Sequence, residues 1–109
     1  MLSKNQRLTG NRIEYLFKKG KKSGNTYFTI IYSPSRNTLS RFCVIVSTKI
    51  FAKAVQRNRL RRQIYEIFRL HPELPSTPAD LVVIAKTPLT KLKFQELTNV
   101  LIKALQHLT

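Results

Sequence analysis

Acidic residues, cysteine and glycine are all scarce in this sequence, and each shortage excludes a class of site. The 109 residues include 5 Asp and Glu, 1 Cys and 3 Gly. A single cysteine excludes an internal disulfide framework and a zinc site built from several cysteines. Three glycines spread along the chain are too few for a glycine-rich loop that cradles phosphates. Neither a disulfide-stapled scaffold nor a P-loop nucleotide-binding protein is therefore expected.

Long apolar runs are also missing. The longest, Phe42 to Val46 and Leu81 to Ala85, have the length of strands and fall far short of the ~20 residues that span a bilayer. The segment from Met1 to Arg7 lacks the apolar stretch of a secretory signal peptide. Together with the lone cysteine, these features predict a cytoplasmic protein that does not contact a membrane.

The acids are too dispersed to indicate a catalytic centre. They are Glu14, Glu66, Glu73, Asp80 and Glu96. A two-metal nuclease usually draws on several carboxylates, and no two of these are close in sequence. Cys43 lies in an apolar run, where a role as a small core residue is expected. Neither His71 nor His107 has the spacing of a metal motif. We therefore predict no catalytic residue, no metal ligand and no cofactor in this chain.

Positive charge is what the sequence has in excess. It contains 20 Lys and Arg, for a net charge of +15, and 42% of its residues are hydrophobic. That composition is typical of one globular domain, here residues 1–109. Because so much uncompensated charge repels itself in a compact domain, it is expected to serve a polyanionic partner. Nucleic acid is the first candidate, and an anionic membrane is the weaker one.

The first half of the chain predicts a short helix and two strands. Asn11 is a possible N-cap for a helix that carries Ile13, Leu16 and Phe17 on one face and ends at Gly20. Residues 25–33 and 41–47 have the β-branched and aromatic content of strands, and their short connection predicts an antiparallel pair. In the first strand, alternation places Phe28 and Ile30 toward the core, and Tyr27, Thr29 and Ile31 toward an open face.

The second half predicts a long helix, a third strand and a closing helix. Within residues 52–70, one stripe of the helix is apolar and faces the core: Leu60, Ile64, Ile67 and Phe68. Residues 81–85 form a strand, expected to lie parallel to the second strand as part of a β-α-β unit. Residues 90–108 form a helix with an apolar stripe at Phe94, Leu97, Leu101, Ala104, Leu105 and Leu108. The predicted fold is an α+β sandwich, α-β-β-α-β-α, with helices packed on a mixed sheet.

The strongest functional signal is the start of the long helix. Residues 53–62 (KAVQRNRLRR) contain five cations and no acid before Glu66. An ordinary solvated helix intersperses acids that pair with cations one turn away. Four of the cations are Arg, whose planar guanidinium suits bidentate phosphate contacts. This pattern indicates contact with nucleic acid rather than a merely solvated helix face.

The spread of the basic groups favours RNA over DNA. They recur at Lys18 to Lys22, at Lys49 and Lys53, along the Arg segment, and at Lys86, Lys91 and Lys93. A reader of duplex grooves concentrates its contacts, whereas a dispersed footprint suits a folded RNA recognised by shape and phosphate contacts. An exposed Tyr27 beside the Arg-rich helix is a candidate to stack on a single-stranded base. A simple role in covering the sheet edge is the alternative for that tyrosine.

Two segments carry a resemblance to a known family. Val46-Ser47-Thr48-Lys49 and the following AVQRNRLRR of residues 54–62 resemble the protein component of bacterial ribonuclease P. That family carries Arg-Asn-Arg followed by one aliphatic and two basic residues. The similarity extends over nearly the whole chain, through Arg7-Leu8, Leu16-Phe17, Gly20, residues 80–86 (DLVVIAK) and the closing amphipathic helix.

The resemblance implies a fold, an activity and partners. The fold would have a left-handed β-α-β crossover, against the usual right-handed rule. The chain would be the protein component of an endoribonuclease that removes the 5′ leader of precursor tRNA, bound as a monomer in a 1:1 complex with ribonuclease P RNA. The catalytic centre and its magnesium ions would belong to that RNA. The implied RNA contacts are Lys49, Lys53, Arg57, Asn58, Arg59, Arg61 and Arg62.

The leader of precursor tRNA would enter a cleft between the Arg-rich helix and the sheet, lined by Phe17, Tyr27 and Tyr65. Some positions depart from the family pattern. Thr48 stands where a lysine is frequent, and Tyr65 replaces a common Arg, which exchanges a phosphate contact for stacking. Ile13 and Ile31 stand where family members often have aromatics in the cleft. The alternatives to this assignment are a ribosomal protein of similar shape and a nuclease that cuts RNA unaided.

Overall fold

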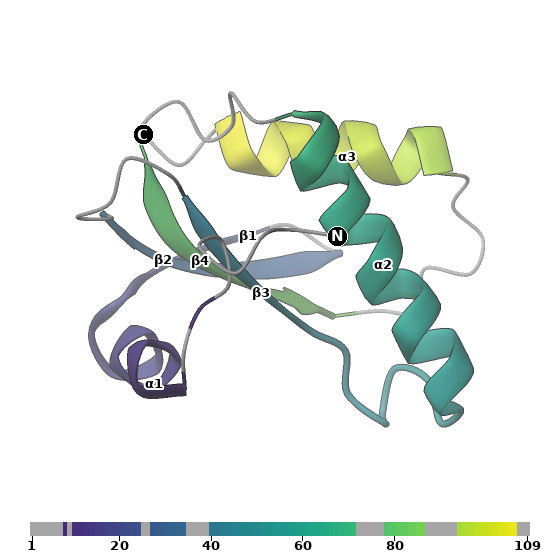
Figure 1. Cartoon of the computed structure of the whole chain (residues 1–109), viewed down its shortest axis with the longest axis horizontal. Helices are drawn as coiled ribbons and strands as arrows, with labels where there is room; N and C mark the ends of the chain where they lie inside the picture. Colours follow the sequence, from purple (N-terminus) through teal and green to yellow (C-terminus); the bar gives the residue numbers. More distant parts are fainter. Residues whose placement is uncertain are drawn as a thin grey trace.

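A computed structural model describes residues 8, 10–24, 27–34, 40–71, 78–86 and 94–106. Within these ranges the chain forms three helices packed on a four-stranded mixed sheet (Figure 1). The helices are α1 (Gly10–Lys19), α2 (Ala54–Leu70) and α3 (Phe94–Gln106). The strands are β1 (Lys21–Gly24), β2 (Phe28–Pro34), β3 (Arg41–Ile45) and β4 (Ala79–Ala85). The predicted α+β class is confirmed, and no helix in the described ranges has the length and apolar content to cross a bilayer.

The strand order is β1-β2-β4-β3, with β4 in the interior of the sheet. The predicted pairing of β2 with β3 was wrong: β2 pairs antiparallel with β4, and β3 pairs parallel with β4. The physical reason is that Leu81, Val82 and Val83 are all fully buried, so β4 needs cover on both faces and a neighbour on each side. The parallel pairing of β3 with β4 was predicted and is confirmed. The left-handed crossover through α2 stays a prediction.

The edge strand β1 was not predicted. Its sequence, Lys21-Lys22-Ser23-Gly24, has no apolar alternation, and it is extended because it pairs antiparallel with β2. An edge strand that carries lysines is a common protection against pairing with another chain. Gly20 makes the turn from α1 into this strand. A β-carbon on Gly20 would lie 2.6 Å from the carbonyl oxygen of Leu16, which already accepts the Gly20 N–H at 2.8 Å.

The two faces of the sheet carry different helices. α2 and α3 cover one face and bury the larger core, and the predicted α2 stripe of Leu60, Ile64, Ile67 and Phe68 is confirmed as buried. On the other face α1 places Leu16 against Ile31 and Val82 in a second, small cluster. Ile31 was predicted to lie on an open face, but it is only 2% exposed because α1 covers it. In Figure 1, α1 lies on the side of the sheet away from α2 and α3.

Three details of the helices differ from the prediction. α1 begins at Gly10, so Asn11 lies inside the first turn rather than at the N-cap. On the predicted apolar face of α1, Leu16 is fully buried but Phe17 is 47% exposed. Phe94, placed on the buried stripe of the last helix, is 38% exposed at its first position. The residues of that helix outside 94–106, Leu108 among them, lie outside the described part of the chain.

Candidate RNA-binding surface

The side of α2 that faces away from the core carries most of the predicted RNA contacts. At 100° per residue, the apolar stripe and the cations fall on different sides of this helix. The predicted contacts that are exposed are Lys49, Lys53, Asn58, Arg59 and Arg62, and those that are half-buried are Arg57 and Arg61. Since the first acid of α2 is Glu66, its first two turns offer donors and positive charge without an acidic neighbour.

Arg57 is engaged within the protein itself. Its Nη1 donates to the carbonyl oxygens of Phe51 at 2.9 Å and Ala52 at 2.8 Å. The N-cap residue of α2, Lys53, makes no side-chain capping hydrogen bond. The Arg57 guanidinium therefore ties the segment before α2 to the first turn of the helix. Lys49 and Lys53 lie close in sequence to the carbonyl groups that Arg57 holds.

Arg59 and Arg62 are the arginines of this helix that remain available. Both are exposed, and neither makes a hydrogen bond or ion pair to another described residue. An arginine with its donors in water binds a phosphate without first breaking a contact within the protein. These two side chains are the readiest candidates on α2 for contact with a phosphate.

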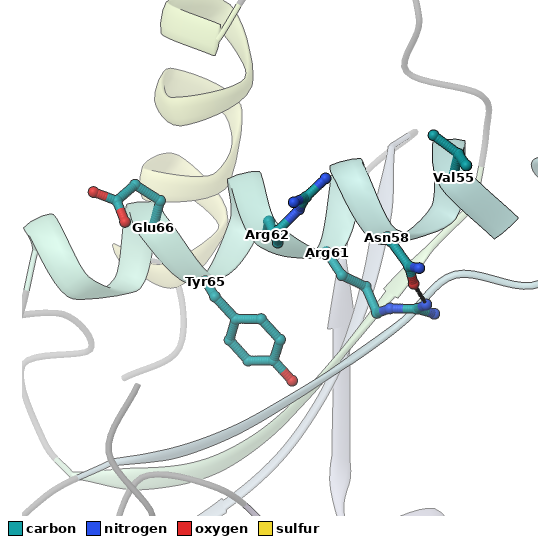
Figure 2. A pocket seen from close by; sticks show the side chains of 6 residues that line it. All are labelled: Val55, Asn58, Arg61, Arg62, Tyr65 and Glu66. Carbon is teal, nitrogen blue, oxygen red and sulfur yellow. Dashed lines mark hydrogen bonds between the residues drawn. The ribbon is translucent and has the colours of Figure 1, made fainter. Parts of the chain in front are cut away.

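A depression runs along the outer side of α2, with a volume of about 570 Å³ (Figure 2). It is lined by Val55, Asn58, Arg61, Arg62, Tyr65 and Glu66. Arg61 donates to the side-chain oxygen of Asn58. The Tyr65 hydroxyl oxygen accepts the backbone N–H of Val44 on β3 at 3.2 Å. In Figure 2 the Tyr65 ring points toward the strands, on the same side of the helix as the Arg61–Asn58 pair.

Glu66 is the lining residue furthest toward the C-terminal end of α2. Arg69, one turn further along α2, donates to both of its carboxylate oxygens. These hydrogen bonds lower the pKa of the Glu66 carboxyl below its ordinary value, so the group is ionised at neutral pH. The depression therefore combines two arginines, one carboxylate acceptor and one aromatic ring.

The aromatic residues predicted to line a leader cleft do not come together. Phe17 lies on α1, whereas Tyr27 and Tyr65 pack against the larger core on the opposite face of the sheet. Between α2 and the sheet the described residues pack as core, with Phe42 stacked on Phe68 at a ring separation of 3.9 Å. The functional roles of the three aromatics stay predictions.

Asp80 is a feature that sequence reasoning missed. It is 0% exposed at the start of β4, and Arg41 grips it in a bidentate pair with N···O distances of 2.9 and 2.8 Å. Arg12 of α1 donates to the same carboxylate at 2.6 Å and lies over the Tyr15 ring. Burial by itself raises the pKa of the Asp80 carboxyl, but the hydrogen bonds from Arg41 and Arg12 outweigh burial and hold it below its ordinary value.

The remaining titratable groups give no sign of a metal centre. Within the described ranges, no three His, Cys, Asp or Glu side chains gather closely enough to hold an ion. Cys43 is half-buried on β3 beside the α1 cluster, and burial raises the pKa of its thiol. A raised pKa disfavours the reactive thiolate, in keeping with a packing role.

Comparison with known proteins agrees with this geometry. A family model described as Ribonuclease P matches residues 2–109. The ribonuclease P protein component of Syntrophus aciditrophicus is 35% identical, over 99% of this chain and 94% of that protein. That of Bacillus pumilus is 36% identical, over 98% of this chain and 87% of that protein.

Solved structures give the same answer for the fold. The RNase P protein from Thermotoga maritima superposes with a TM-score of 0.86 at 30% identity, over 94% of this chain and 97% of that one. The RNase P protein of Staphylococcus aureus superposes with a TM-score of 0.81 at 26% identity, over 93% of each chain. With its sequence matched almost end to end and its fold shared, this chain belongs to the ribonuclease P protein family.

Proposed function

We propose that this chain, as a protein subunit of the tRNA-processing ribonuclease P, binds the RNA subunit through the outer side of α2 and promotes removal of the 5′ leader from precursor tRNA. The observation that carries the proposal is the arrangement of α2. One side of the helix is buried core, and the other presents Asn58, Arg59 and Arg62 to solvent. A folded helix that keeps arginines free of acidic partners in its first turns is suited to a polyanion.

The proposal assigns the cleavage chemistry to the RNA subunit. Asp80 and Glu66 are each committed to arginine partners, so these carboxylates do not form a donor set that fits magnesium. The magnesium ions needed for cleavage would then be held by RNA. The protein contributes binding and positioning, as a cytoplasmic monomer in a 1:1 complex. The predicted contacts of Phe17, Tyr27 and Tyr65 with the single-stranded leader belong to the same proposal.

Reconstitution tests the proposal. The protein is mixed with ribonuclease P RNA, and cleavage of a precursor tRNA is followed at a magnesium concentration too low for the RNA to work well alone. We expect strong stimulation with the RNA subunit and no cleavage by the protein alone. Failure to stimulate would refute the proposed function, and cleavage by the protein alone would indicate a nuclease that needs no RNA subunit.

Single substitutions locate the contact. Arg62→Ala is expected to weaken binding to ribonuclease P RNA and to reduce the salt dependence of the affinity by about one released counterion. Lys103→Ala is the matched control, since Lys103 is an exposed cation on α3, away from the outer side of α2. Equal affinity and equal salt dependence for the two variants would contradict the assignment of this surface.

A further inference from the structure

The depression on α2 has features that simple phosphate contact does not require. A surface that only neutralises phosphates needs cations alone. Here Arg61 and Arg62 share the depression with the ring of Tyr65 and the carboxylate of Glu66. The Glu66 carboxylate, which already accepts hydrogen bonds from Arg69, does not attract phosphate, whereas an aromatic ring offers a stacking surface to a base. The mixture of groups therefore matches a whole nucleotide better than a phosphate.

The Tyr65 ring is held in a fixed position. Its hydroxyl oxygen accepts the N–H of Val44 at 3.2 Å, and its partly buried side chain packs against the larger core. An aromatic ring that is anchored at its hydroxyl loses little side-chain entropy when a base stacks on it. Base-on-aromatic stacking is a main source of affinity for unpaired nucleotides.

The other lining residues form two groups in Figure 2: Asn58 and Arg61 project on the same side of α2 as Tyr65, and Val55, Arg62 and Glu66 project on the other. Asn58 and Arg61 are joined by a hydrogen bond on the same side of the helix (Figure 2), and Arg62 has no partner among the described residues. Val55, which is 75% exposed, lines the depression at the start of α2 and offers an apolar contact to a neighbouring sugar or base. A volume of about 570 Å³ lies within the ~300–1,000 Å³ typical of small-molecule sites.

We propose that this depression binds one unpaired nucleotide of the RNA subunit, with the base stacked on Tyr65 and its flanking phosphates held by Arg61 and Arg62. The RNA subunit is the chosen source because the depression is continuous with the exposed arginines of α2. The inference rests on the proposed function and deepens it. It adds recognition of an unpaired base to a surface otherwise expected to read phosphates.

The first test separates the ring from its hydroxyl. Binding of ribonuclease P RNA is measured for Tyr65→Phe and Tyr65→Leu, with Phe94→Leu as the control for loss of a partly exposed aromatic on α3. We expect Tyr65→Phe and the control to stay within about twofold of the unaltered protein. Tyr65→Leu should lose about tenfold, as for removal of one stacked base, with an unchanged salt dependence. Equal affinities for Tyr65→Phe and Tyr65→Leu would overturn the proposal.

A second measurement does not depend on the folding of any variant. The complex of unaltered protein and ribonuclease P RNA is irradiated with ultraviolet light, and the nucleotide joined to the Tyr65 peptide is identified by mass spectrometry. A cross-link to a nucleotide that chemical probing shows to be unpaired supports the proposal. A cross-link to a base-paired nucleotide, to the leader of added precursor tRNA, or to none refutes it. If the unaltered protein fails to bind the RNA at all, the proposed function fails first.

Discussion

Replacing Asp80 by Asn removes one negative charge from a buried site while keeping the shape of the side chain. The carboxylate accepts three hydrogen bonds from Arg41 and Arg12 at 2.6–2.9 Å and is itself 0% exposed. Asparagine offers one acceptor oxygen, and its amide group points donors at guanidinium donors. The substitution therefore leaves two arginines facing a neutral group.

The size of the destabilisation depends on how far the two arginine side chains are exposed to solvent. Removing one partner of a fully buried ion pair costs ~3–5 kcal/mol. Here the Arg12 and Arg41 side chains are 26% and 23% exposed, so water can solvate part of their charge once the carboxylate is gone. We expect Asp80→Asn to lower the free energy of unfolding by about 2–3 kcal/mol. For a domain of this size that corresponds to a fall in Tm of about 10 °C or more.

Urea denaturation followed by circular dichroism measures this difference. Glu66→Gln is the matched control, because it neutralises a carboxylate whose arginine pair lies at the surface, and it should change the midpoint little. If Asp80→Asn and Glu66→Gln had the same small effect, the buried cluster would not be holding α1 against the sheet. A large effect of both would point to net charge rather than to the buried geometry.

Three further predictions concern other parts of the chain. The pKa of Asp80 is lowered in the folded protein, so the stabilisation by its ionised form is fully present above the unfolded pKa of about 3.9. That stabilisation is lost as the pH falls through the lower folded pKa. A pH series of Tm should show the loss below about pH 4, and Asp80→Asn should flatten the series. Arg57→Ala should weaken RNA binding with little change in the salt dependence of the affinity, since Arg57 holds the backbone before α2. Arg59→Ala should reduce that salt dependence by about one released counterion. Equal salt dependence for the two variants would contradict this distinction. Gly20→Ala should lower the free energy of unfolding by about 1–3 kcal/mol, because the added β-carbon would lie 2.6 Å from a carbonyl oxygen. Gly10→Ala is the control, since its β-carbon would meet nothing within 4 Å. Equal urea midpoints for the two variants would refute the steric argument.

The apolar face of α2 was predictable, whereas the strand order was predicted incorrectly. The spacing of Leu60, Ile64, Ile67 and Phe68 fixes one buried stripe whatever the rest of the fold does. Strand order depends on which strand needs two covered faces. The continuous apolar run from Leu81 to Ala85 indicates such a strand, and it gives the signal that would have placed β4 in the interior. Short connections between β2 and β3 suggested direct pairing, but β4 lies between them.

Other features depend on tertiary contacts that no local pattern records. β1 is extended because its backbone pairs with β2, since Lys21-Lys22-Ser23-Gly24 has no strand periodicity. Asp80 and Arg12 are 68 positions apart in sequence, so an acid expected to be isolated became the centre of an ionic cluster. The candidate RNA-binding surface likewise combines a feature that the sequence predicts with one that only the structure shows. Sequence placed Arg57 among the RNA contacts, but only the structure shows its guanidinium on the carbonyl oxygens of Phe51 and Ala52.

The start of α2 is electrostatically unfavourable in the protein by itself. A helix N-terminus carries partial positive charge, which favours acids and disfavours cations in the first turn. α2 has no acid in its first turn, and its N-cap residue Lys53 supplies no side-chain cap. Arg57 and Arg59 add further positive charge within that region. Phosphates near this end would accept hydrogen bonds from the free N–H groups and oppose the helix dipole. An RNA bound there, as proposed, would relieve a repulsion that core residues such as Leu60 and Ile64 otherwise offset. A helix built only for stability would place Ser or Asp at its start. The cations found there instead support the view that the first turns of α2 face RNA.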